Sequence, residues 1–298
     1  MGSSKFSFYL LLLGELIIAP LKYLQNQIKW SFGDSRNTRC ALKKRVPVLS
    51  DNVAVCVHEW GGYKDRRKKK INNIKEFECG LYYQLLRFGN YHGKRSLNLT
   101  VSISEKFLMK EHIKNVKMIE VSNVGMDFSG YEQFFESIKN DDNQYVILTN
   151  TSVNKKQVDF IDEYIDYFEQ HETIGIMGVS VSSKIYQSLI RNNFNPHLQS
   201  FFLLTTTAVL KEIVEKNGCF PGKGIDHKLM LIRMGEVRLS KVAMELGYQL
   251  ACILEDGKPF VFDKAFFKDN GRRSWHIPFG DYRLGAENPN AINPLHLK

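Results

Sequence analysis

Short apolar segments alternate with amphipathic ones through the middle of the chain. The short segments are rich in β-branched residues and are therefore predicted to be strands. They lie at residues 53–58, 97–104, 116–121, 145–149, 173–179 and 248–254. Helical periodicity occupies 71–88, 128–138 and 157–170, and two later segments that end at 216 and 246. Strands separated by helices of this length predict an α/β fold, with a mostly parallel Rossmann-type sheet and helices on both faces.

A separate apolar segment, residues 6–19, opens the chain. It is short for a bilayer span, which needs about 20 apolar residues, and Glu15 lies in its middle. From Pro20 onward, leucine and isoleucine recur on one face of a second predicted helix. We expect residues 1–33 to form amphipathic helices that lie on a membrane surface. The alternative is that they pack on the protein's own core or on a partner chain.

Positive charge is concentrated near this end of the chain. The net charge is +9, and two clusters of cations occur at Lys64–Lys70 and Arg36–Arg45. Such clusters suit nucleic acid, anionic lipid or a phosphate-bearing substrate, although many are simply solvated. The neighbouring apolar segment favours an anionic membrane surface, so residues 34–50 are interpreted as a basic linker. Nucleic acid is not an expected partner, because the chain has no helix-turn-helix, RRM or zinc pattern.

The chain's size and cysteine content complete the outline. A chain of 298 residues, 43% of them hydrophobic, is large enough for one substantial domain with appendages. We assign residues 51–255 to that domain. Residues 256–298 are rich in Pro, Asn and Gly, and are predicted to be an irregular C-terminal extension. Five scattered cysteines without CxxC spacing indicate neither a disulfide framework nor a zinc site, which fits a reducing cytoplasm.

Polar residues follow several of the predicted strands. They are His58 after the first strand, Asn123, Gly125 and Asp127 after the third, and Asn150, Thr151 and Ser152 after the fourth. Each is an ordinary turn residue by itself. Together they converge on the carboxyl edge of a parallel sheet, where open α/β folds bind ligands. No GxGxxG or GxxxxGK[ST] phosphate loop is present, so the classical dinucleotide and P-loop ligands lose support.

Four segments carry a resemblance to a known family. They are NVGMDFSGYEQF at 123–134, YVILTNTS at 145–152, HLQSFFLLT at 197–205 and GEVRLSKVAMELGYQL at 235–250. In this order they resemble the rhamnan synthesis F family of bacterial polysaccharide glycosyltransferases, which is similar to the GT-A nucleotide-sugar transferases. The resemblance covers roughly residues 52–255. It implies a GT-A-like fold and a nucleotide-sugar donor.

The resemblance also implies where the donor binds. Asn123, Gly125 and Asp127 match a segment that lines the nucleotide pocket. The Asn150–Ser152 turn matches the strand end where GT-A enzymes hold Mg²⁺ or Mn²⁺ with Asp-x-Asp, and where this family usually has Asn-Asp-Ser. Thr151 replaces the central acid, and a hard cation binds weakly to amide and hydroxyl ligands alone. Either the metal is dispensable and a cation such as Arg191 or Lys184 neutralises the leaving phosphate, or Asp127 supplies the carboxylate.

Two further segments supply candidates for acceptor binding and catalysis. His197 and Gln199 in the HLQS segment are expected to contact acceptor or donor; the alternative for His197 is a core or capping histidine. Glu236 precedes a predicted helix at the position where related GT-A enzymes place an acidic base, and an inverting transfer needs such a carboxylate. Its alternative is an acid that favourably charges a helix N-terminus. Asp226 is the substitute base.

These expectations describe a cytoplasmic glycosyltransferase bound peripherally to the inner face of the cell membrane. It would move a hexosyl or deoxyhexosyl group, such as rhamnose, from a nucleotide-sugar to a lipid-linked surface polysaccharide. Whether it needs Mg²⁺ or Mn²⁺ stays open. The alternative function is a non-catalytic subunit that binds nucleotide-sugar or glycan in a polysaccharide assembly complex.

Overall fold

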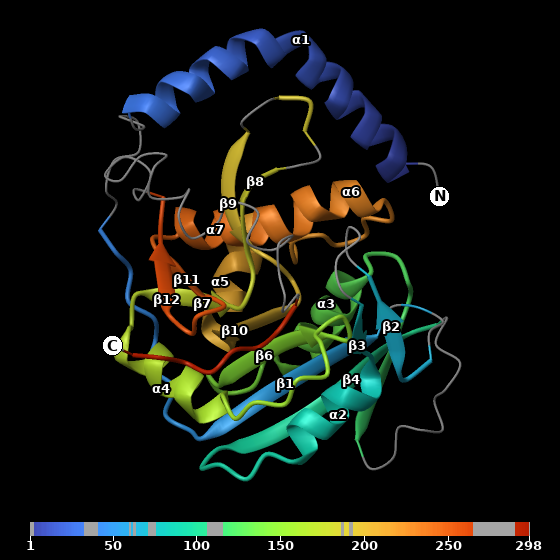
Figure 1. Ribbon diagram of the computed structural model, residues 1–298, viewed down its shortest axis with the longest axis vertical. Coiled ribbons are helices and arrows are strands. Elements are labelled where there is room, and N and C mark those ends of the chain that lie inside the picture. Colours follow the sequence, from blue (N-terminus) through green and yellow to red (C-terminus); the bar gives the residue numbers. More distant parts are fainter. Residues whose placement is uncertain are drawn as a thin grey trace.

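The computed structural model describes residues 3–32, 41–59, 61, 64–70, 76–105, 116–185, 188–190, 193–264 and 290–297. Within these ranges, eight strands form one sheet in the order β12-β11-β7-β10-β6-β1-β4-β5 (Figure 1). The strands are β1 (Asn52–Glu59), β4 (Ser96–Ser104), β5 (Lys117–Val121), β6 (Tyr145–Asn150), β7 (Ile174–Gly178), β10 (Phe202–Thr206), β11 (Gln249–Ile253) and β12 (Pro259–Phe262). Two hairpins lie outside the sheet: β2 (Arg67–Lys69) with β3 (Phe77–Cys79), and β8 (Val181–Lys184) with β9 (Phe194–Leu198).

The sheet is parallel except at two strands. β1 pairs in parallel with both β4 and β6, β4 with β5, and β7 with β11. β10 runs antiparallel between β6 and β7, and β12 is an antiparallel edge strand. Because β10 is reversed, the residues that precede it lie at the same edge as the residues that follow β1 and β6.

Helices cover both faces of the sheet. They are α2 (Leu81–Gly89), α3 (Asp127–Ile138), α4 (Ile161–Gln170), α5 (Thr207–Asn217), α6 (Lys228–Leu231), the π-helical segment η2 (Ile232–Val237) and α7 (Arg238–Glu245). Successive residues of β1 alternate between the two cores: Ala54 and Cys56 pack with α3, α5 and α7, whereas Val53 and Val55 pack with α2 and α4. The predicted α/β fold with helices on both faces is therefore confirmed.

One predicted helix is only half correct. The segment 71–88 was expected to be helical throughout, but Phe77–Cys79 forms strand β3 and the helix begins at Leu81. The break lies at Gly80, whose φ of 133° is accessible to glycine and whose position leaves no room for a Cβ against the Asp65 carbonyl. Residues 71–75 of the predicted helix lie outside the described residues.

The C-terminal segment also differs from its prediction. The sheet continues past residue 255, because β12 pairs with β11. Residues 290–297 have no regular structure, as expected, but they pack on the protein: Ala291 and Ile292 are buried. Asn290 donates a hydrogen bond from Nδ2 to the carbonyl of Ser152, at 3.0 Å. This segment is therefore part of the folded unit.

The predicted basic linker is tied to the domain where the structure describes it. Lys43 pairs with Glu212, and Lys44 with Glu172. Arg45 is buried over the ring of Phe168, 3.6 Å from its centroid. Three of the five cations expected to face a membrane are therefore engaged within the protein. Arg36 and Arg39 lie outside the described residues.

The N-terminus forms one helix, α1 (Ser3–Phe32), where two were predicted. Pro20 was expected to begin a second helix, but the helix continues through it and arches over the top of the molecule (Figure 1). Pro20 is exposed, so its ring is accommodated on the outer side and the helix does not end. The inner side carries buried Ser4, Phe8 and Glu15 at helical spacing. By length and composition, Ser4–Ile28 could cross a membrane.

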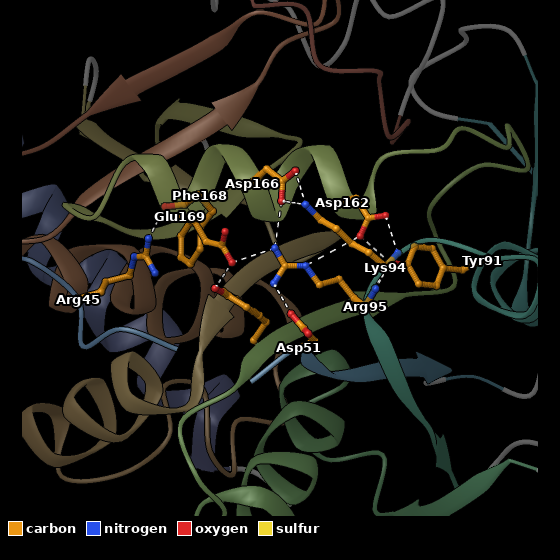
Figure 2. A network of polar contacts seen from close by, with 10 residues as sticks. Arg45, Asp51, Tyr91, Lys94, Arg95, Asp162, Asp166, Phe168 and Glu169 are labelled. Atoms are coloured by element: carbon orange, nitrogen blue, oxygen red, sulfur yellow. Dashed lines mark hydrogen bonds and ion pairs between the residues drawn. The ribbon is translucent and has the colours of Figure 1, made fainter. Parts of the chain in front are cut away.

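A buried arginine organises the amino edge of the sheet (Figure 2). Arg95 precedes β4, and only 6% of its side chain is exposed. Its guanidinium contacts Asp166 at 3.0 Å, Glu169 at 2.9 Å and Asp51 at 3.4 Å. Two of these acids lie on α4, so the network fixes this helix to the strand ends opposite the predicted site.

Candidate functional site

Four polar side chains meet at the carboxyl edge of the sheet. Asn150 ends β6, Asp127 begins α3, Ser200 lies just before the reversed strand β10, and Glu236 lies on η2. Asn150 Nδ2 donates to Asp127 Oδ2 at 2.6 Å, and Ser200 Oγ lies 3.2 Å from the same oxygen. Ser200 Oγ is also 2.9 Å from Glu236 Oε1. The serine hydroxyl thus bridges two carboxylates that are 109 residues apart in the sequence.

The two carboxylates influence each other. The pKa of Asp127 is raised to about 6, chiefly because burial disfavours its charged form and secondly because of the negative charge of Glu236. Hydrogen bonds from Asn150 and Ser200 oppose the shift. The raised pKa lets Asp127 hold its proton at a higher pH than an exposed carboxyl group does. An acid pair of this kind is suited to proton transfer.

A strained turn presents Asp127. Gly125 has φ 93°, and Met126 has φ 46° and ψ −124°, which is rare for a residue with a side chain. The turn places Asp127 in the first turn of α3, where a carboxylate is favoured by the helix dipole. Asp127 Oδ1 and Asn123 Oδ1 are buried and have no hydrogen-bond partner among the described residues. Unpartnered buried acceptors are costly, and a bound ligand with hydroxyl or amide donors would satisfy them.

Glu236 is held by an irregular helix. It was predicted to precede a helix, but α6, η2 and α7 form one continuous helical run, and Glu236 lies within the π-helical part. Its carboxylate is therefore not at a free helix N-terminus, and the alternative role of charging that terminus loses its basis. Single π turns within α-helices are frequent at functional sites.

A second group of charged residues lies beside the first, at the end of β1. Glu59 has no exposed side-chain surface and forms an ion pair with Arg67, with Nη1 and Oε2 2.6 Å apart. Thr151 donates its hydroxyl to the same Glu59 oxygen and accepts from Arg67 Nη2 at 2.9 Å. Lys69 Nζ donates to Ser152 Oγ at 3.1 Å. The hydroxyl of Thr151, the residue at the position where a metal-binding acid was expected, is therefore hydrogen-bonded to both members of this ion pair.

Four of the predicted site residues have partners other than the two carboxylates among the contacts described. His58 is fully buried beneath α3, with Nδ1 3.2 Å from Ser102 Oγ, and burial lowers its pKa to about 3. His197 and Gln199 are buried near the β8–β9 hairpin, where Gln199 accepts from Ser180 at 2.6 Å. Asp226 donates its backbone N–H to Ser4 of α1 at 3.3 Å. Contact of any of these with a ligand stays a prediction.

Sequence reasoning missed Ser200, Arg67 and Lys69. Ser200 was visible as the last residue of HLQS, but nothing in the sequence indicated that it would bridge two acids. Arg67 and Lys69 were included in a run of cations taken for a surface cluster; strand alternation, had β2 been recognised, would have separated them from Lys68. Of the cations predicted to neutralise a phosphate, Arg191 and the side chain of Lys184 lie outside the described residues.

The described residues contain no group of three or more His, Cys, Asp or Glu side chains that could hold a metal ion. A cavity of about 400 Å³ lies near the amino edge, between α2 and α4. Its lining includes the acids Asp159, Asp162 and Glu163 together with Arg87 and His92.

Comparisons with known proteins give limited guidance. No family model matches the chain, and no curated protein matches it. Among solved structures, the chain is similar to the bifunctional IspDF from Campylobacter jejuni, with a TM-score of 0.35 and 14% sequence identity. The similarity covers 62% of this chain and 48% of that one, so the chain spans about half the length of the structure it matches.

Proposed function

We propose that this protein is a glycosyltransferase that uses a nucleotide-sugar donor, with Glu236 as the general base. The observation that carries the proposal is the pair of carboxylates, Asp127 and Glu236, joined through Ser200 Oγ at the carboxyl edge of the sheet. Open α/β sheets bind ligands at this edge. An inverting sugar transfer needs a carboxylate that accepts the proton of the acceptor hydroxyl.

Each residue of the site has a chemical role in this proposal. Glu236 takes the proton from the acceptor hydroxyl as that oxygen attacks the sugar carbon. Asn123 and Asp127 accept hydrogen bonds from the hydroxyls or base of the donor nucleotide through their unpartnered oxygens. Asn150 and Ser200 orient Asp127 and Glu236 through the hydrogen bonds described above. Asp226, tied to α1, is the weaker candidate for the base.

The proposed acceptor is a lipid-linked glycan at the inner face of the cell membrane. α1 supports this, because its outer side exposes a continuous set of large apolar residues: Phe6, Tyr9, Leu10, Leu13, Leu16, Ile17, Leu21, Leu24 and Ile28. Its inner side is docked on the protein through Phe8 and Glu15. A helix with one docked side and one apolar side is suited to lie in the plane of the interface.

Membership in the rhamnan synthesis F-like family is part of the proposal. It rests on the four collinear sequence segments, and it directs attention to hexosyl and deoxyhexosyl donors. The cations of residues 64–70 contribute less to membrane binding than their number suggests, since Arg67 and Lys69 contact Glu59 and Ser152.

The test is nucleoside diphosphate release from a panel of nucleotide-sugars by the purified full chain. We expect Glu236→Gln to lower kcat by about 10²- to 10⁴-fold with little change in donor affinity, since general base catalysis contributes about that much. Glu245→Gln, which breaks a pair with Lys241 on α7, is the matched control and is expected to keep activity. A large loss in Asp226→Asn instead would make Asp226 the base. Wild-type turnover in Glu236→Gln would remove this residue from the mechanism.

A separate experiment addresses the membrane. The paired substitution Leu16→Ser and Ile17→Ser should reduce co-sedimentation with vesicles of phosphatidylglycerol and phosphatidylcholine. Leu49→Ser is the control, because Leu49 is 97% exposed but does not lie on α1. Equal sedimentation of both variants would exclude α1 as the membrane-binding element.

The second candidate function is a non-catalytic subunit that binds nucleotide-sugar or glycan. The observation in its favour is Thr151, which stands where the family usually has an acid and which is bonded to Glu59. A subunit of this kind would bind a nucleotide-sugar, as judged by a raised melting temperature, without hydrolysing or transferring it. Turnover by the pure protein excludes it.

A further inference from the structure

The β2–β3 hairpin presents cations on alternate sides. Arg67 and Lys69 point toward the ends of β1 and β6, where they contact Glu59 and Ser152. Lys68 points the other way, 65% exposed, and pairs with Glu76 at 3.2 Å. Alternation along a strand therefore delivers two of the three cations to the candidate site.

The two inward cations are held differently. Arg67 is only 13% exposed and is committed to Glu59 and to both the hydroxyl and the carbonyl of Thr151. Lys69 is partly buried and hydrogen-bonds Ser152, a neutral hydroxyl, so that interaction leaves its charge uncompensated. Its pKa is lowered, mainly by burial; Asp127 opposes this, whereas Arg67 and Lys228 reinforce it. Two cations therefore lie at the Asn150–Ser152 turn, and Arg67 is the one that is paired with Glu59.

This chemistry does not fit a divalent metal. Mg²⁺ and Mn²⁺ bind best where several carboxylate oxygens converge. The two nearby carboxylates are already bonded, Asp127 to Asn150 and Ser200, and Glu236 to Ser200. At the turn itself, Thr151 supplies a hydroxyl that is bonded to Glu59, and Lys69 places an ammonium group beside Ser152. A fixed cation beside the turn repels a second one.

We propose that Lys69 is the electrostatic substitute for this metal, and that it binds the diphosphate of the nucleotide-sugar donor. The inference rests on the proposed function. In the transfer, the bond between the sugar carbon and the diphosphate oxygen breaks as the acceptor oxygen bonds to that carbon. The electron pair of the broken bond stays on the diphosphate, where Lys69 stabilises the added charge, and the acceptor proton goes to Glu236. Lysine is an established phosphate ligand in proteins, acting as a point charge.

The test measures binding of UDP, GDP, dTDP and inorganic pyrophosphate by calorimetry in EDTA. We expect wild-type protein to bind at least one nucleoside diphosphate without metal. Lys69→Met should weaken that binding about tenfold or more, because a charge-assisted hydrogen bond is lost. Lys69→Arg should restore most of it, and Lys68→Met should leave it unchanged.

Two of these variants separate a ligand role from a structural one. Lys69→Arg keeps a charge at this position, and Lys68→Met removes an exposed charge from the same strand. Melting temperatures establish that each variant is folded. Wild-type affinity in Lys69→Met, or loss of wild-type binding in EDTA, would overturn the assignment of Lys69. Failure of the wild-type protein to bind any nucleoside diphosphate, with or without Mn²⁺, would overturn the proposed function as well.

Discussion

The carboxylate of Glu15 on α1 and the guanidinium of Arg233 on η2 form an ion pair through two contacts, at 2.8 and 3.2 Å. Both side chains are largely buried, and Glu15 also accepts from Ser188 and from the backbone of Leu189. The pair joins the helix with the exposed apolar side to the segment that carries Glu236. The N-terminal helix and the candidate site are thus mechanically connected.

Glu15→Gln is expected to destabilise the protein by about 3 kcal/mol, because it leaves Arg233 buried without its counter-charge. Urea unfolding measures this free energy, and hydrogen exchange should show earlier opening of α1. The control is Glu136→Gln, which breaks an exposed pair with Lys139 and should cost less than about 1 kcal/mol. Replacing Glu15 and Arg233 together by methionine should recover much of the lost stability. If it does not, the loss in Glu15→Gln is not explained by the uncompensated charge of Arg233.

Asp127 makes stability fall as pH rises through the acidic range. Its folded pKa of about 6 lies above the ordinary value of 3.8. Below about pH 4 both folded and unfolded chains hold the proton, whereas between about 4 and 6 the unfolded chain releases it first, which favours unfolding. Above pH 6 the carboxyl group of Asp127 is ionised in both states, and its full destabilisation of the folded state is present. As the pH rises from 4 to 7, the free energy of unfolding of Asp127→Asn should therefore increase by about 1 to 2 kcal/mol relative to that of the wild type. Urea unfolding at a series of pH values measures this difference. Asp142→Asn, at an exposed site, is the control, and equal pH profiles for both would refute this account.

Gly130 allows α3 to lie close to the sheet. A Cβ there would stand 2.1 Å from His58 Nδ1 and 2.7 Å from Ser102 Oγ. Although alanine is the better helix former, Gly130→Ala should lower stability by about 1 to 3 kcal/mol through overpacking. It should also weaken nucleotide binding, since α3 carries Asp127. Gly14→Ala provides the contrast: it is also helical, has open space around it, and should be neutral or stabilising. Similar thermal shifts in the two variants would contradict the close packing.

Arg95→Met should cost about 1 to 2 kcal/mol, because the contacts of its buried guanidinium with Asp51, Asp166 and Glu169 are lost but the three acids stay in contact with solvent. Arg95→Lys should be intermediate, since lysine cannot reproduce the forked geometry. Lys94→Met is the control, as Lys94 is 57% exposed. Nucleotide binding should be unchanged in the folded fraction of all three variants, because the network lies at the opposite edge of the sheet; a selective loss of binding would show that the two edges are coupled.

The sheet was predictable because its strands are locally encoded. The strand predicted at 145–149 is found at Tyr145–Asn150, and its residues alternate between the two cores. The helix predicted from 71 failed because the periodicity of Phe77 and Leu81 is compatible with either structure, and only the hairpin partner, residues 67–69, decides between them.

The site was less predictable than the fold. Asp127 and Asn150 were chosen from their positions after strands and Glu236 from the resemblance, and the structure brings their side chains together through Ser200. Their roles in binding and catalysis stay predictions. Pairings such as Glu15 with Arg233 join residues 218 positions apart. Nothing local to either residue specifies such a partner, so one sequence alone does not reveal it.

The π-helical segment η2 has a consequence for how this protein can change during evolution. A π turn contains one more residue than the α turn it replaces. Deleting a single residue between 232 and 237 would restore an α-helix and leave the flanking turns on nearly the same faces, because the wider turn already absorbs the extra residue. Side chains inside the segment, Arg233 and Glu236 among them, would change direction, while Leu239 stayed in the core. Length variation should therefore be tolerated in the surface loops of this protein and selected against within these six residues.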